Sequence, residues 1–196
     1  GFAFATARSI RVAGAPVLAL RITYVGELGW ELHVPTEFVQ GVYDALVESG
    51  RKRRISNVGY RAIETLRLEK AYRAWGAELS PDHTPLEAGL GWAVKLKKNV
   101  EFIGRDALKT QLAGTLAKQL VGVSVDDSSV TLLGRETILR DGERVGWLTS
   151  GGYGYSVGKS IGYGYVRNPD GISPAFLSQG VYELDVATEP VACSLF

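Results

Sequence analysis

Several residue types are scarce in this chain, and each scarcity excludes a class of site. Among 196 residues there is one cysteine, Cys193, so no disulfide forms within the chain and no multi-cysteine zinc or iron–sulfur site is possible. The two histidines, His33 and His83, are too few for a metal site to be expected. A chain without disulfides is typical of a reducing compartment.

Neither sign of charge is in excess. The chain has 22 basic and 21 acidic residues, a net charge of +1, which argues against nucleic acid or an anionic membrane as its partner. No run of 18 apolar residues occurs, so no membrane span is predicted. The chain is long enough to bury a core without disulfide or metal staples.

Methionine is absent, and the opening residues 1–5 have neither the basic segment nor the apolar core of a signal peptide. We therefore expect the chain to be a piece of a longer polypeptide.

Two apolar or alternating runs in the first half predict a β-hairpin. They cover residues 18–25 and 30–34, and a Gly-Glu-Leu-Gly turn at residues 26–29 joins them. Within the second run, alternation places Glu31 and His33 on the face opposite Trp30, Leu32 and Val34.

Helical periodicity follows in several places. One helix is predicted from a cap at Thr36 to a stop at Gly50, a second begins near Asn57 with Ile63 and Leu66 inward, and a third covers residues 104–112. A capping box at residues 84–87 predicts a short helix, and residues 92–96 are predicted to return as a strand.

From about residue 117 the pattern changes to short strands without helices. An Asp-Gly turn at residues 141–142 joins two of them. This spacing favours a small closed barrel or a sandwich. The fold class predicted is α+β, with a boundary near residues 113–117 that divides the chain into 1–114 and 115–196. The strands are predicted at 120–125, 136–140, 144–148, 159–166 and 181–187.

Motifs for nucleotide cofactors are incomplete. Residues 152–154 open like a dinucleotide fingerprint, but Val157 stands where the third glycine is needed, and residues 158–160 end like a phosphate loop without its first glycine. No flavin or nicotinamide site is predicted, and no nucleophile elbow supports a Ser-His-Asp arrangement.

A small set of polar and aromatic residues remains. Tyr24 and Glu31 flank the hairpin turn, Arg61 starts a helix, and Tyr72 and Trp75 follow that helix. A carboxylate accepts two parallel N–H groups such as the edge of a pterin offers, aromatic faces sandwich its ring, and an arginine holds a carboxylate tail. The plainer interpretation, a carboxylate satisfied within the hairpin together with core aromatics, stays open on composition alone.

Motifs along nearly the whole chain resemble the glycine-cleavage T-protein (aminomethyltransferase) family. Two further segments, LEKAYRAWG at 68–76 and FLSQG at 176–180, are similar to the C-terminal folate module of sarcosine and dimethylglycine dehydrogenases. The T-protein motifs are LRITYVGELGWEL at 20–32, TLRLE at 65–69, PLEAGLG at 85–91, FIGRDAL at 102–108, and TSGG at 149–152 with GKSI at 158–161.

The resemblance implies a fold, a function and a site. The fold is part of the family's folate-binding domain, an antiparallel sheet with helices, followed by the C-terminal barrel. The dehydrogenases oxidise an N-methylglycine on a flavin domain and pass the one-carbon unit to tetrahydrofolate, which gives 5,10-methylenetetrahydrofolate. Glu31 would bind the pterin edge, Tyr24 would help form the site, Arg61 would bind substrate, and Tyr72 or Trp75 would line the pocket.

The chain also departs from the family pattern. No residue matches the family's Asp of methylene transfer, so no catalytic residue and no metal ligand is assigned. The expected cofactor is tetrahydrofolate, with FAD only in a flavin dehydrogenase domain of the same parent chain, and the fragment alone is expected to be inactive.

Two alternatives remain: a free glycine-cleavage aminomethyltransferase, or a non-catalytic regulatory subunit that keeps the module. No nucleic acid or membrane partner is expected. The expected location is a bacterial cytoplasm or the mitochondrial matrix.

Overall fold

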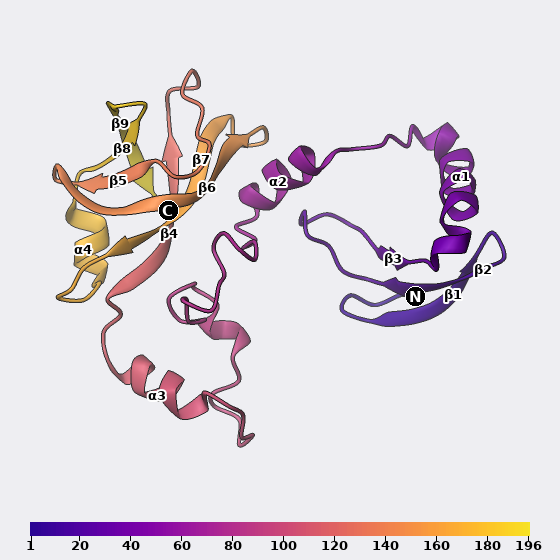
Figure 1. The fold of residues 1–196 in the computed structure, drawn as a ribbon, viewed down its shortest axis with the longest axis horizontal. Helices are drawn as coiled ribbons and strands as arrows, with labels where there is room; N and C mark the ends of the chain where they lie inside the picture. Colours follow the sequence, from indigo (N-terminus) through magenta and orange to yellow (C-terminus); the bar gives the residue numbers. More distant parts are fainter. The chain divides into compact units, whose positions relative to one another are not determined.

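The computed structural model describes residues 1–196 and divides into two compact units, Gly1–Leu66 and Arg67–Phe196 (Figure 1). The first contains a three-stranded sheet with a helix, and the second contains a closed antiparallel barrel. The predicted α+β class with a C-terminal barrel is thus confirmed.

The sheet of the first unit has the order β1-β2-β3, with strands Ala7–Val12, Ala15–Leu20 and Glu31–His33. β1 and β2 are joined by a two-residue turn in which Ala13 and Gly14 both have positive φ. This strand pair was not predicted from the sequence. The core beneath the sheet contains Ala15, Val17 and Val42, with Ile10, Val12, Leu32 and Val34 packed around them.

The helix over this core is α1 (Val39–Gly50), between the 3₁₀ turns η1 (Thr36–Phe38) and η2 (Arg51–Arg53). Its predicted position is confirmed, because Val42 points into the sheet core. The predicted cap at Thr36 is wrong: the helix begins after a 3₁₀ turn, and no side chain caps either element.

Helix α2 (Tyr60–Glu69) begins in the first unit, and its last turn belongs to the second. The prediction that Leu66 faces inward is wrong, since Leu66 is exposed while Arg67 and Leu68 are fully buried. Leu68 packs against Leu120, Ile161, Tyr163 and Tyr165 on the barrel.

The segment between α2 and the barrel is mostly turns. Its regular elements are η3 (Gly91–Ala93) and α3 (Arg105–Ala113). The capping box is real, with Thr84 N donating to Glu87 Oε2 at 2.8 Å and Glu87 N to Thr84 Oγ1 at 3.2 Å, but it closes a single turn and not a helix. The strand predicted at 92–96 is wrong, because η3 and turns occupy these residues.

The barrel has the closed order β4-β7-β6-β5-β8-β9. Every strand predicted for the barrel is present, whereas β9 and the helix α4 were not predicted. Side chains alternate between the inside and the outside of the barrel along each strand. The inward-facing set includes the buried residues Val123, Ile138, Leu148, Val166 and Leu184. No helix of the chain is both long and apolar enough to cross a membrane. The bounds are β4 Lys118–Val125, β5 Thr137–Arg140, β6 Glu143–Gly154, β7 Lys159–Arg167, α4 Pro174–Gln179, β8 Tyr182–Val186 and β9 Glu189–Leu195.

Close strand contact in the barrel predicts the effect of one glycine substitution. A Cβ at Gly146 would overlap the Tyr165 carbonyl oxygen, so Gly146→Ala should lower the free energy of unfolding by about 1–3 kcal/mol, measured by urea denaturation. The matched control is Gly41→Ala in α1, where nothing lies within 4 Å, and it should be neutral or slightly stabilising. Equal effects from the two variants would contradict this assignment.

Candidate functional site

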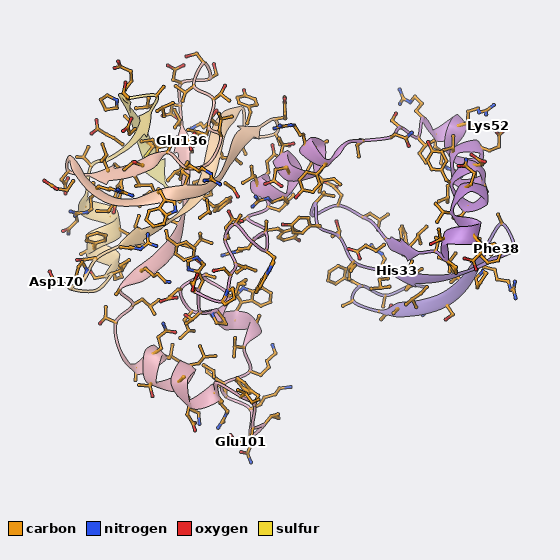
Figure 2. All side chains as sticks on the ribbon, viewed as in Figure 1. His33, Phe38, Lys52, Glu101, Glu136 and Asp170 are labelled. Carbon is orange, nitrogen blue, oxygen red and sulfur yellow. The ribbon has the colours of Figure 1, made fainter.

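The polar face of the β2–β3 hairpin carries Glu31. The register pairs Leu20 with Glu31 and Ala19 with Leu32, and Leu32 packs towards the sheet core. Glu31 and His33 therefore lie on the opposite face, as predicted, with 53% and 58% of their side chains exposed (His33 is labelled in Figure 2). Glu31 Oε2 lies 3.8 Å from His33 Nε2, a weak surface contact that leaves the carboxylate open to a ligand.

The connection between β2 and β3 is longer than predicted. β2 ends at Leu20, so residues 21–30 form a loop and not a tight turn. Arg21 closes it, because its guanidinium donates to the Gly29 carbonyl at 3.0 Å and lies 4.7 Å from the centre of the Trp30 ring. Tyr24 lies in this loop and is partly exposed, so the structure places it in the same hairpin as Glu31.

The other three predicted residues lie on other elements. Arg61 is exposed in the first turn of α2, and no hydrogen bond or ion pair joins it to Glu31. Tyr72 and Trp75 lie in the second unit, on the loop that follows α2, and most of the Trp75 side chain is exposed. The five residues are thus divided between the two units, and their assembly into one site stays a prediction.

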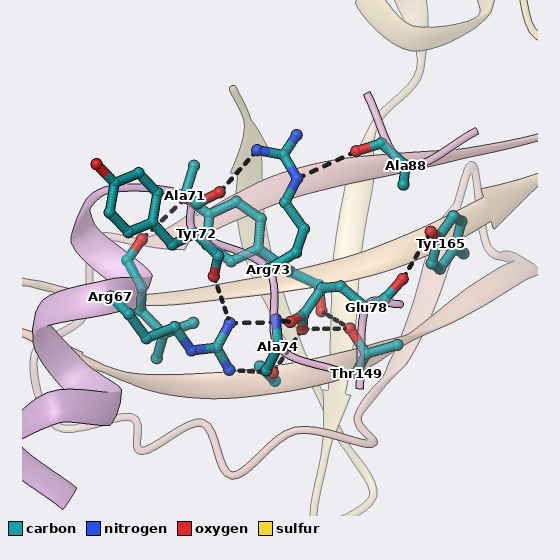
Figure 3. Close-up of polar contacts among 12 residues, drawn as sticks. Arg67, Ala71, Tyr72, Arg73, Ala74, Glu78, Ala88, Thr149 and Tyr165 are labelled. Carbon is teal, nitrogen blue, oxygen red and sulfur yellow. Dashed lines mark hydrogen bonds and ion pairs between the residues drawn. The ribbon is translucent and has the colours of Figure 1, made fainter. Parts of the chain in front are cut away.

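A buried polar network supports the loop that carries Tyr72 and Trp75 (Figure 3). Arg67 and Glu78 are both fully buried and form an ion pair of 2.9 Å between Nη1 and Oε2. Ser150 accepts from Arg67 Nη2 at 2.6 Å and donates to Glu78 Oε1 at 2.5 Å, while Thr149 donates to the same oxygen at 2.7 Å. Both charges are therefore satisfied on several sides, as a buried pair requires.

The same network fixes the loop backbone. Arg67 Nη1 donates to the Tyr72 carbonyl at 3.0 Å, and Ala74 N donates to Glu78 Oε2 at 2.9 Å. The Tyr165 hydroxyl donates to the Glu78 carbonyl at 2.8 Å, which attaches the loop to β7. This network was not predicted from the sequence, because an Arg and a Glu eleven positions apart are most simply solvent-facing. The only signal was the leucine on either side of Arg67.

A histidine lies beside this network. The His83 ring stacks on Tyr165 with 4.1 Å between the ring centres and an interplanar angle of 12°. Burial and the nearby Lys118 lower the pKa of His83, and its Nδ1 is buried without a hydrogen bond. Burial also raises the pKa of Tyr165 to about 12. Burial thus disfavours the charged form of each ring. No cluster of three potential metal ligands surrounds them or occurs elsewhere in the chain.

Comparison with known proteins gives concordant matches. The family model "GCVT N-terminal domain" matches residues 1–98, and "Glycine cleavage T-protein C-terminal barrel domain" matches residues 118–196. Sarcosine dehydrogenase, mitochondrial, of Mus musculus is 45% identical over 94% of this chain and 20% of that protein. Dimethylglycine dehydrogenase, mitochondrial, of Homo sapiens is 46% identical over 84% of this chain and 19% of that protein.

A solved structure agrees with these matches. Glycine cleavage system aminomethyltransferase T from Bartonella henselae is similar with a TM-score of 0.79 and 26% sequence identity, over 91% of this chain and 48% of that one. The chain thus spans about a fifth of the length of the two dehydrogenases and about half of the aminomethyltransferase.

The buried ion pair predicts a large loss of stability when one charge is removed. Glu78→Gln leaves the Arg67 guanidinium buried without its counter-charge and should lower the free energy of unfolding by about 3–5 kcal/mol in urea denaturation. Glu143→Gln, the same change at an exposed position, should have an effect within about 0.5 kcal/mol. A Glu78→Gln protein as stable as Glu143→Gln would show that the pair does not hold the loop.

His83 predicts a pH dependence of stability. Because its pKa is lowered in the folded protein, the unfolded chain takes up this proton first as the pH falls through about 6.5, so the free energy of unfolding should decrease below that pH. His83→Phe keeps a ring stacked on Tyr165 but removes the titration, and its free energy of unfolding should fall less between about pH 7.5 and about pH 5.5. Parallel pH profiles for the two proteins, measured by urea unfolding, would refute the assignment to His83.

Proposed function

Since the chain belongs to the glycine-cleavage T-protein (aminomethyltransferase) family, as its motifs indicated, we propose that it is the tetrahydrofolate-binding C-terminal portion of a sarcosine or dimethylglycine dehydrogenase-like enzyme. The parent enzyme would transfer a one-carbon unit from an N-methylglycine to tetrahydrofolate and form 5,10-methylenetetrahydrofolate. The level of identity to the two dehydrogenases supports this substrate class.

The observation that carries the proposal is the exposed Glu31 carboxylate on the polar face of the hairpin. Its oxygens make only the long contact to His33, so both are available to parallel N–H donors of a pterin. A carboxylate that served only to stabilise the hairpin would be expected to accept a short hydrogen bond from it, and none is present. The open carboxylate supports the proposal that Glu31 binds the pterin edge.

Each of the other proposed residues has a separate role. Arg61, whose guanidinium has no partner in the chain, would hold the carboxylate of the ligand through a bidentate contact. Tyr24, Tyr72 and Trp75 would supply aromatic faces for its rings. Tetrahydrofolate, when bound, supplies the nitrogens that accept the one-carbon unit, and these residues would orient it and exclude water.

The remaining parts of the reaction would lie in the parent chain. We propose a flavin dehydrogenase domain, which carries FAD, as the partner of this module, because the chain spans about a fifth of each dehydrogenase. The family's catalytic Asp has no match here, so the fragment alone is proposed to be inactive. The domain division at 1–114 and 115–196 is kept as part of the proposal, and the location proposed is the mitochondrial matrix or a bacterial cytoplasm.

A free aminomethyltransferase is the second candidate, because the structure from Bartonella henselae matches the fold over most of this chain. Its donor would be an aminomethyl-lipoyl carrier protein and not an N-methylglycine. A flavin spectrum in the intact parent protein supports the dehydrogenase, whereas a flavin-free parent of about twice this length supports the second candidate.

Calorimetric titration with 5-formyltetrahydrofolate tests the folate site in this chain and in its full-length parent. Glu31→Gln keeps the shape of the side chain but loses its charge, so the affinity should fall by about 1.5–3 kcal/mol; Tyr24→Phe should cost about 1 kcal/mol. The matched control, Glu37→Gln in η1, should bind as the unaltered protein does.

Unchanged affinity in Glu31→Gln would remove Glu31 from the site. A parent that binds no folate at all would favour the regulatory subunit, with the module kept as a scaffold.

A further inference from the structure

A pocket on the outside of the barrel is a second candidate site. It has a volume of about 420 Å³, within the range of small-molecule sites. None of the five residues proposed for folate lines it. The lining residues come from the loop after α2 and from β5, β6 and the turn before β5: Gly76, Ala77, Arg135, Thr137, Arg144, Trp147, Leu148 and Thr149.

Three arginines without acidic partners gather around this pocket. Arg135 and Arg144 line the pocket. The guanidinium groups of Arg167 and Arg144 lie 4.0 Å and 5.7 Å from the centre of the Trp147 ring. None of the three is within ion-pair distance of a carboxylate, and Arg167 Nη1 is buried without a hydrogen bond. Elsewhere in the same unit Arg67, Arg105 and Arg140 each contact a carboxylate at 2.6–2.9 Å.

The acidic residues nearest in the chain do not neutralise these arginines. Glu136, labelled in Figure 2, follows Arg135, but its Oε1 accepts from Leu133 N at 2.7 Å and it forms no ion pair. Glu143 precedes Arg144 in the β5–β6 hairpin and forms no ion pair either. Asp185 lies across from Thr137 in the β5–β8 pair and forms no ion pair either, so the guanidinium groups of Arg135 and Arg144 are unpaired at the pocket.

The backbone at Arg135 provides independent support. Arg135 has φ of 105°, a conformation that side-chain-bearing residues rarely adopt, and it follows Gly134, also with positive φ. A Cβ on Gly134 would lie 3.0 Å from Ser150 Cα, so the turn is held against β6. The turn thus holds the backbone of Arg135 in a fixed place beside the pocket that it lines.

We propose that this pocket binds a small anion with two or more carboxylate or phosphate groups. Arg135 and Arg144 would each hold one acidic group through their planar donor forks. The Thr137 hydroxyl, which has no hydrogen bond within the protein, would supply a further donor. Arg167 on the Trp147 ring would hold that ring in place and add to the positive potential.

Calorimetric titration of the whole chain at low ionic strength tests this site, with pyrophosphate and citrate as probes. One saturable site is expected, and Arg135→Gln and Arg144→Gln should each raise its Kd about ten-fold or more, since hydrogen bonds to charged groups are strong. Arg144→Lys keeps the charge without the fork, so its Kd should fall between those of the unaltered protein and Arg144→Gln.

Two controls separate this site from other effects. Arg53→Gln makes the same charge change at an exposed position in the first unit and should leave the Kd unchanged. Glu31→Gln should also leave the Kd of the anion probe unchanged. The test of this pocket is therefore independent of the test of the folate site. Far-UV circular dichroism checks that each variant is folded.

The two probes identify the source of the anion. Competition between pyrophosphate and citrate at one site supports a pocket that takes both phosphate and carboxylate groups. Binding of pyrophosphate alone assigns the site to phosphates, and binding of citrate alone assigns it to carboxylates. Absence of saturable binding by both probes, or equal weakening by Arg53→Gln, overturns the proposal.

Discussion

The buried contact between Arg67 and Glu78 joins the last turn of a helix, an irregular loop and two barrel strands. An ion pair at full burial is costly unless each oxygen and nitrogen has a partner. Here Ser150, Thr149 and the Ala74 amide supply those partners. Because the loop has little regular structure, its conformation depends on these bonds more than on a backbone ladder, and so does the presentation of Tyr72 and Trp75.

The fold was predictable where the signal is local. Alternation located the strands of the barrel, and the Asp-Gly turn at 141–142 is present with both residues at positive φ. Errors occurred where a tertiary contact overrides the pattern. The segment 92–96 has the composition of a strand, but no neighbouring strand is available to pair with it. Arg67 has the side chain of a surface residue, and only a carboxylate eleven positions later makes its burial possible.

The candidate site was predictable in part for a related reason. Glu31 and Tyr24 could be placed in one hairpin, because the Gly-Glu-Leu-Gly segment at 26–29 marks the connection between them. Period-two alternation then gave the face on which Glu31 lies. Arg61, Tyr72 and Trp75 came from motif positions, which give no information about distance. The pocket around Trp147 could not be predicted at all: its arginines are separated in sequence, and what distinguishes them is that none forms an ion pair.

The two sheets of this protein differ in whether they have edge strands. The barrel closes, so β4 pairs with β9 and every strand has two neighbours. The three-stranded sheet is open, and β1 and β3 are its edges. Open edges are where strands of other molecules add to a sheet, and charged side chains on an edge strand hinder that addition. Within these residues β1, the longer of the two edge strands, carries two such side chains, Arg8 and Arg11.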